Sequence, residues 1–296
     1  MGAIVTEGLT KAYGPTLALD GLDLVVDGGE IFGFLGPNGA GKTTTIRLLL
    51  DLIRPTAGRA AVLGHDCQRE SLAVRSAVGY LPGDLRLYPG LTGRETIDYV
   101  AGLRERPVDE GYVRELVDRL DLDLSRKVAT YSKGNRQKLG VVLALLDRPP
   151  VLLLDEPTSG LDPLLQHAVW QVLRARANEG ATVFFSSHVL SEVEQVCERV
   201  GFLREGRLVA VEPVAALKRR ARRRMHVRFA NGQPPPGAFD LPGVSEVART
   251  DGAITFETAG DMDPFIKALA QYHVVDLHAE EATLDDIMLA FYEREG

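Results

Sequence analysis

Residues 31–50 of the chain read IFGFLGPNGAGKTTTIRLLL, and this stretch decides the fold. Within it, a glycine, four further residues and Gly-Lys-Thr form the pattern of a phosphate-binding loop. The apolar run 31–35 is typical of a short buried strand, and Ile46, Leu49 and Leu50 fall at helical spacing. We therefore expect a strand, a glycine-rich loop and a helix, in this order.

This order predicts a site for a nucleoside triphosphate. Glycines let backbone N–H groups point inward at phosphate oxygens, and the N-terminus of the next helix attracts the same anion. We expect Lys42 to lie on the β- and γ-phosphates and the hydroxyl of Thr43 to ligate Mg²⁺. The alternative, a glycine turn that only links a strand to a helix, does not explain why motif and context agree. The candidate binding residues of the loop are Gly36, Pro37, Asn38, Gly39, Ala40, Gly41, Lys42, Thr43 and Thr44.

The bulk composition is that of a globular protein with one large domain or two ordinary ones. The 296 residues are 45% hydrophobic and 25% charged, and the net charge of −7 argues against extensive binding to nucleic acid. Cys67 and Cys197 have no metal-ligand or redox spacing, so we expect reduced, buried thiols. No apolar run approaches the ~18 residues that cross a bilayer, and no secretory signal is evident. We expect a soluble, cytosolic protein.

A second group of polar residues follows apolar strands. The run 151–154 is typical of a central parallel strand, and Asp155 at its end is expected to hold Mg²⁺, directly or through water. Glu156 is expected to polarise the attacking water as a general base. His188, after the next predicted strand, is expected to contact the γ-phosphate and hold the water and Glu156 in line. Taken alone, a histidine in this place is usually structural.

The segment 131–138, Tyr-Ser-Lys-Gly-Asn-Arg-Gln-Lys, predicts a second anion site. Ser132 and Gly134 open a helix whose N-terminal N–H groups can bind phosphate. One chain with two such sites needs only one nucleotide, so the economical arrangement is two chains head to tail, each completing the site of the other. An ordinary helix capped by Ser132 is the alternative.

The predicted organisation is an α/β core followed by a small α+β domain. Thr92 and Glu95 form a capping box at the start of a helical stretch, and Asp251-Gly252 joins a predicted hairpin. The expected parts are a nucleotide-binding domain at 1–216 with a helical insert at about 82–150, a basic linker at 217–224 and an accessory domain at 225–296 with helices near 264–270 and 283–292.

The run 218–224 contains six Lys or Arg among its seven residues. It could lie against anionic lipid head groups, where each charge contributes ~1 kcal/mol. The alternative is a solvated helix end and linker. Binding of nucleic acid is not expected, because the chain is acidic and no aromatic residues alternate with the basic ones.

With these motifs in this order, the chain resembles the ATP-binding cassette (ABC) ATPases over residues 3–213. The resemblance implies a P-loop NTPase core with a mainly parallel sheet, an antiparallel β part and a helical insert, and it implies ATP and Mg²⁺ as cofactors. By this resemblance, Tyr13 is the aromatic residue that stacks on adenine, 36–44 is the Walker A loop, and Ser132 to Gln137, with Gly134 and Asn135, is the signature. Asp155 is the metal ligand of Walker B, and Ser159 to Asp162 is the D-loop. The implied catalytic residues are Glu156, His188 and Lys42.

The resemblance further implies ATP-driven closure of two cassettes and reopening by hydrolysis. The small appended domain and the ending 284–287 are similar to the bacterial drug-exporter branch, whose permease is a separate polypeptide. We therefore expect a homodimer or a pair with a sister cassette, peripheral on the inner face of the membrane. The alternatives are a soluble ABC mechanoenzyme acting on nucleic acid or ribosomes, and a regulatory module switched by ATP.

Two positions depart from the family pattern. Gly83 stands where the Q-loop glutamine is expected, and Asp84 or a water is the candidate to replace its contact with the metal. Lys133 stands where the signature usually has its first glycine. Its ammonium either adds charge toward the γ-phosphate or faces solvent.

Overall fold

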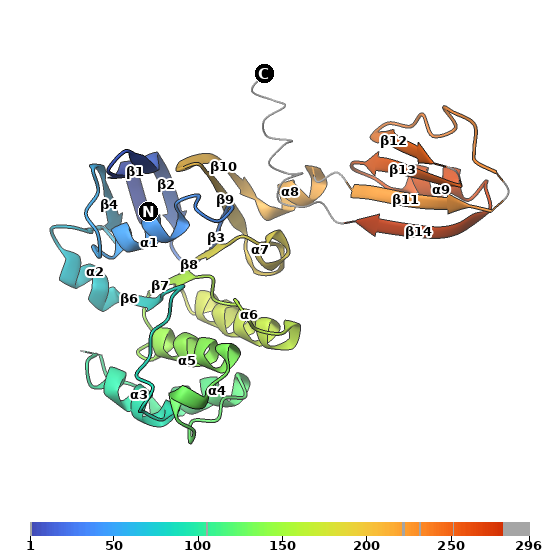
Figure 1. The fold of residues 1–296 in the computed structure, drawn as a ribbon. Helices are drawn as coiled ribbons and strands as arrows, with labels where there is room; N and C mark the ends of the chain where they lie inside the picture. The colour runs from blue at the N-terminus through green and yellow to red at the C-terminus, as the bar shows by residue number, and fades with distance from the viewer. Residues whose placement is uncertain (1, 105, 221–222, 231, 251, 281–296) are drawn as a thin grey trace. The chain divides into compact units, whose positions relative to one another are not determined.

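The computed structural model describes residues 2–104, 106–220, 223–230, 232–250 and 252–280 of the chain (Figure 1). By their internal contacts the residues divide into two compact units, with the boundary between Glu212 and Pro213. The sequence analysis predicted that the nucleotide-binding domain ends at 216, four residues after Glu212. The first unit holds all the motifs of the predicted nucleotide site.

The central sheet of the first unit has six strands, in the order β10 (Arg207–Pro213), β9 (Arg199–Arg204), β3 (Ile31–Leu35), β8 (Thr182–Ser187), β7 (Val151–Asp155) and β6 (Val78–Leu81). The pairs from β9 through β3, β8 and β7 to β6 are all parallel. Every residue of β3, β7 and β8 is buried, which explains why the sequence of these strands is almost continuously apolar. The carboxyl ends of these three strands therefore lie at one edge of the sheet.

Helices cover this sheet and carry the loops at its edge. Those in contact with its strands include α1 (Lys42–Leu49), α6 (Pro163–Asn178) and α7 (Leu190–Val196). The strand-loop-helix order predicted around the glycine motif is present as β3 and α1. The α/β fold with a mainly parallel sheet is confirmed.

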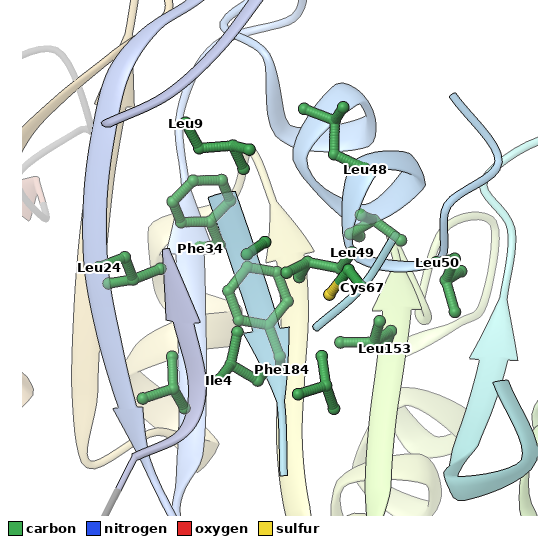
Figure 2. Close-up of a cluster of buried hydrophobic side chains, with 14 of the residues drawn as sticks. Ile4, Leu9, Leu24, Phe34, Leu48, Leu49, Leu50, Cys67, Leu153 and Phe184 are labelled. Atoms are coloured by element: carbon green, nitrogen blue, oxygen red, sulfur yellow. The ribbon is translucent and has the colours of Figure 1, made fainter. Parts of the chain in front are cut away.

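A second, antiparallel sheet has the order β2 (Thr16–Asp27), β1 (Gly2–Tyr13), β4 (Ala57–Val62) and β5 (His65–Asp66). The main hydrophobic core takes side chains from both sheets and from α1, among them Ile4, Leu24, Phe34, Leu49 and Phe184 (Figure 2). The rings of Phe34 and Phe184, on neighbouring strands, lie 5.1 Å apart. This packing holds α1, and with it the glycine loop, in a fixed place.

The helical insert contains α3 (Gly93–Ala101), α4 (Glu110–Arg119) and α5 (Lys133–Leu145), between β6 and β7 in the chain. The predicted capping box is present at α3. The Thr92 hydroxyl accepts a hydrogen bond from the Glu95 N–H at 3.2 Å, and the Glu95 carboxylate accepts one from the Thr92 N–H at 2.7 Å. The short α2 (Ser71–Ala77) and β6 were not predicted, because so few residues show no clear period.

In its described residues, the second unit has a four-stranded antiparallel sheet and two helices. Its elements are α8 (Val214–Arg220), β11 (Arg223–Phe229), β12 (Val244–Thr250), β13 (Ala253–Thr258), α9 (Asp263–Leu269) and β14 (Val274–Glu280), with the sheet order β12-β13-β11-β14. Its core is rich in aromatic rings, with Phe239 packed on Phe256 and Phe265.

The basic run 218–224 is not a separate linker throughout. The helix α8 continues to Arg220 and β11 begins at Arg223, so the described part of the run belongs to regular elements. Alanine, lysine and arginine are good helix formers, which favours the extension of α8 into the run. The helix predicted near 283–292 and the ending 284–287 lie outside the described residues. Among the residues that are described, no helix is long and apolar enough to cross a membrane.

Candidate active site

The glycine loop needs its glycines for steric reasons. A Cβ atom on Gly36 would lie 2.2 Å from the carbonyl oxygen of Leu203, which is closer than any real contact. Gly41, which precedes the first residue of α1, has a φ of 112°, in the left-handed region that favours glycine. The loop can therefore turn tightly from β3 into α1 only with glycine at these two positions.

Lys42 is buried at the start of α1, with 5% of its surface exposed. Its ammonium donates hydrogen bonds to the carbonyl oxygens of Gly36, at 2.6 Å, and of Pro37, at 3.0 Å. Burial lowers the pKa of Lys42, while the nearby carboxylates of Glu156 and Asp155 act in the opposite direction. An ammonium group has three N–H donors, so one remains for a ligand in the loop.

Asp155 ends β7 and is 2% exposed. Its Oδ2 accepts a hydrogen bond from the Thr43 hydroxyl at 2.7 Å, and its Oδ1 accepts one from the Ser186 hydroxyl at 2.5 Å. Thr43 and Asp155 are 112 residues apart in the chain, and the sheet brings them together. A carboxylate and a hydroxyl are hard oxygen donors, which fit Mg²⁺ bound jointly with substrate phosphates.

Glu156 and His188 are also adjacent. The Nδ1 of His188 and the Oε1 of Glu156 lie 3.0 Å apart, and both side chains are partly exposed. The backbone of Glu156 has a φ of 51°, which is uncommon for a residue with a side chain, and its N–H donates to the Ser186 carbonyl oxygen at 3.2 Å. This backbone turn directs the residue toward the glycine loop.

The glycine loop and Glu156 line one cavity of ≈ 160 Å³. Its walls are Ala18, Asn38, Gly39, Gly41, Lys42, Thr43, Thr44 and Glu156. Ala18, on β2, was missed by sequence reasoning, because nothing in the local sequence shows that the antiparallel sheet reaches the loop. A cavity with these walls can hold a phosphate chain beside a carboxylate base.

Other predicted site residues do not line this cavity. Ser132 caps α5, and its hydroxyl accepts a hydrogen bond from the Asn135 N–H at 3.1 Å. Asp162 caps α6 by accepting from the N–H groups of the two residues at 164 and 165. Tyr13 is 46% exposed at the end of β1, with the ammonium of Lys11 5.0 Å from its ring centre. Ser132, Gly134 and Asn135 of the signature are thus at least partly exposed at the surface of this chain, outside the loop cavity, and so is Tyr13.

Lys133 is engaged within its own chain. Its ammonium donates a hydrogen bond to the Ser159 hydroxyl at 3.1 Å. Its carbon chain lies close to Gly160, where an added Cβ would be 3.0 Å from the Cδ of the lysine. The side chain of Lys133 is nevertheless exposed, so within this chain it faces solvent while it bonds Ser159. A role of its charge toward the γ-phosphate stays a prediction.

Gly83 lies directly against Asp155. A Cβ at this position would be 3.0 Å from the Oδ2 of Asp155. Asp84, in contrast, forms an exposed ion pair with Arg86 at 2.9 Å. The backbone at 83, and not the Asp84 side chain, is therefore the neighbour of the metal-ligand candidate.

Two further residues hold the site: Gln137, which the sequence analysis named only as the end of the signature segment, and Ser186, which no motif singled out. Gln137 is buried on α5 and donates hydrogen bonds to the carbonyl oxygens of Glu156, at 3.0 Å, and Pro157, at 2.9 Å. Ser186 bonds the Asp155 carboxylate. The one available signal for Ser186 was its place near the end of an apolar strand, two residues before His188.

The chain is similar to several known proteins. The family model described as ABC transporter matches residues 19–159. A daunorubicin resistance ATP-binding protein of Streptomyces coeruleorubidus is 42% identical over 220 residues, which cover 73% of this chain and 70% of that protein. The Nod factor export ATP-binding protein I of Paraburkholderia xenovorans is 32% identical over 299 residues, 99% of this chain and 98% of that protein. A solved structure of an ATP-binding subunit of an ABC transporter has a TM-score of 0.67 and 30% identity, and the match covers 73% of this chain and 92% of that one.

Proposed function

Because this chain belongs to the ABC transporter family as an ATP-binding subunit, we propose that it hydrolyses MgATP to drive export through a separate membrane permease. The observation that carries the proposal is the cavity in which Lys42, Thr43 and Glu156 converge beside Asp155. Relatives named for drug resistance and for Nod factor export support the direction of transport. Their cargoes differ, so no cargo is carried over.

In the proposed site, the loop 36–44 holds the phosphates and Lys42 contacts the β- and γ-phosphates through its free N–H. Thr43 and Asp155 would hold Mg²⁺, which when bound would neutralise charge on the phosphate oxygens. Glu156 accepts a proton from the attacking water, and His188 orients the Glu156 carboxylate. We assign 1–216 to the nucleotide-binding domain and 225–296 to an accessory domain.

The remaining residues act across a dimer in this proposal. Ser132, Gly134, Asn135 and Asp162 lie outside the cavity of their own chain, which supports a role at the cavity of a second copy or a sister cassette. The helix α5 presents its N-terminal N–H groups next to Ser132, and such groups bind anions. ATP would then be enclosed between two chains.

Mixing two inactive variants tests this arrangement. We expect neither Lys42→Ala nor Ser132→Arg protein to hydrolyse ATP alone. In a mixed dimer, one site combines an intact Lys42 with an intact Ser132, so ATPase activity should return. A different affinity tag on each variant, used in two successive purifications with ATP, isolates the mixed dimer. Mixed dimers without activity would contradict the head-to-tail arrangement.

The contact between Gly83 and Asp155 leads to a further prediction. In Gly83→Ala protein the new methyl group meets a carboxylate that Thr43 and Ser186 hold in place, so Mg²⁺ should bind about tenfold more weakly, as for other changes behind a metal ligand. The Mg²⁺ dependence of ATPase activity measures this effect. The matched control is Asp84→Ala, which should leave the dependence unchanged, because Asp84 pairs with Arg86. The reverse result would give the metal contact to Asp84.

The partner is tested with Glu156→Gln protein, tagged and recovered from gently solubilised native membranes with ATP. Stoichiometric recovery of a multi-spanning membrane protein is the expected result, and it would also establish the place of the chain at the membrane. Recovery with ribosomes or nucleic acid alone would favour the soluble mechanoenzyme instead.

A further inference from the structure

Glu192, in the first turn of α7, joins two segments of the active site. Its Oε1 accepts a hydrogen bond from the Thr158 hydroxyl at 2.6 Å, and its Oε2 accepts one from the Ser187 hydroxyl at 2.5 Å. Thr158 and Ser187 are each 1% exposed. Nothing in the motif pattern of the sequence pointed to Glu192.

Both hydrogen bonds to Glu192 have a carboxylate as their acceptor. Hydrogen bonds to an ionised carboxylate are short and stronger than those between neutral groups. Because both hydroxyls are almost completely buried, water cannot readily replace the carboxylate as their partner. The link through Glu192 should therefore persist in solution, whereas exposed ion pairs are weakened by water and salt.

One end of the link holds the backbone around His188. Ser187 directly precedes His188, and its hydroxyl oxygen also accepts a hydrogen bond from the Val189 N–H at 2.9 Å. The Ser187 hydroxyl therefore links the two residues that flank His188, and it donates its own hydrogen bond to Glu192. His188 itself has a partly exposed side chain, so its place depends on this backbone turn.

The other end holds the loop that follows the base. Thr158 lies just after Glu156 and Pro157, and the carbonyl oxygens of these two residues are bonded to Gln137. The Glu156 side chain is 29% exposed. Among the described residues, the only side chain that bonds its carboxylate is His188. Fixing Thr158 therefore limits how far the loop can move away from His188.

The helix that carries Glu192 is itself anchored. Val193 is fully buried against β3, where a Cβ on Gly33 would lie 2.9 Å from its Cγ1. Leu190 is 8% exposed and Val196 is 6% exposed. The carboxylate is therefore held by a packed helix, outside the cavity that the nucleotide would occupy.

We propose that Glu192 is a positioning residue that holds His188 and Glu156 in register for the attack of water on ATP. The inference rests on the proposed function, since it assumes that Glu156 is the base. Glu192 touches neither substrate nor metal. It acts by tying Ser187 and Thr158, and so the two segments that carry the catalytic pair, to α7.

The test compares Glu192→Ala with Glu192→Gln. The alanine variant loses both bonds, so His188 and Glu156 are held less firmly. The kcat for ATP hydrolysis should fall about tenfold, because a small misplacement of catalytic groups slows the chemical step. KM and the affinity for ATP should change little, because the glycine loop is untouched. Glutamine keeps an oxygen acceptor and adds an N–H donor that a hydroxyl oxygen can accept, so it should restore most of kcat.

A double variant separates positioning from general support of the fold. If Glu192 acts through His188, the loss in kcat for Glu192→Ala and His188→Ala together should match that for His188→Ala alone. Additive losses, an unchanged kcat in Glu192→Ala, or equal losses in the glutamine and alanine variants would each overturn the proposal. If Glu192→Ala does not fold, Thr158→Val, which removes one bond and keeps the shape, takes its place in the same measurements.

The outcome is distinguishable from a failure of the proposed function. If Glu156→Gln protein hydrolyses ATP normally, Glu156 is not the base and the proposed function is wrong at that point. If Glu156→Gln protein is inactive while Glu192→Ala protein has full kcat, only the role of Glu192 is wrong.

Discussion

Replacing Glu156 by glutamine is expected to lower kcat for ATP hydrolysis by about 10²–10⁴-fold, the usual contribution of a general base, while ATP still binds. An amide cannot accept the proton of the attacking water. It has the same size as the carboxylate, however, and its oxygen can still accept a hydrogen bond from His188, which lies 3.0 Å from Glu156. The walls of the cavity and the bonds of Lys42 are unchanged.

Single-turnover hydrolysis and equilibrium binding of ATP measure the two parts of this prediction separately. Size-exclusion chromatography with ATP should also show more dimer, because the closed state is no longer opened by hydrolysis. Glu205→Gln is a matched control, since Glu205 is another glutamate with a positive φ, 49°, but with an exposed side chain outside the cavity. Normal turnover in Glu156→Gln protein would remove Glu156 as the base.

Replacing Lys42 by alanine is expected to abolish turnover and to weaken ATP binding on the order of 10²-fold, as when charge-assisted bonds to phosphate are lost. The ammonium is buried across the loop, and its removal leaves the carbonyl oxygens of Gly36 and Pro37 without their donor. The site then loses both its cation and part of the support of the loop.

Lys138→Ala is the matched control for this variant. Lys138 is also 5% exposed, and its ammonium also donates to a backbone carbonyl oxygen, that of Asp121, at 2.9 Å. It should cost stability but leave the affinity for ATP unchanged. If the unaltered protein hydrolyses ATP steadily and Lys42→Ala protein does not, the chain is not a regulatory module that binds ATP with little turnover. Hydrolysis that survives in Lys42→Ala protein would mean that the loop is not the catalytic site.

The sequence predicted the parts of the site whose signals are local. The spacing of glycines and Lys42 indicated the loop, the apolar run before Asp155 indicated a central strand, and Thr92 with Glu95 indicated the start of a helix. Each of these patterns lies within a few residues of the feature it predicts, and each is present in the structure.

Contacts between distant segments were not predictable in the same way. Ser186 bonds Asp155 across 31 residues, and Glu192 bonds Thr158 across 34. Nothing near these residues in the sequence shows their partners. The proximity of Gly83 to Asp155 is of the same kind, because it depends on how the loop after β6 runs beside β7.

By itself, then, the sequence determined the strand, loop and helix around the glycine motif, the central strand before Asp155 and the ABC family, because backbone propensity, hydrophobic period and motif spacing act over short stretches of chain. Only the tertiary structure decided which side chains meet. The parallel register pairs Asp155 with Ser186 and Leu35 with Ser187, and so brings the ends of β3, β7 and β8 together. Packing of the helices on that sheet then places Lys42, Gln137 and Glu192 around Glu156, because close-packed interiors allow few alternative arrangements.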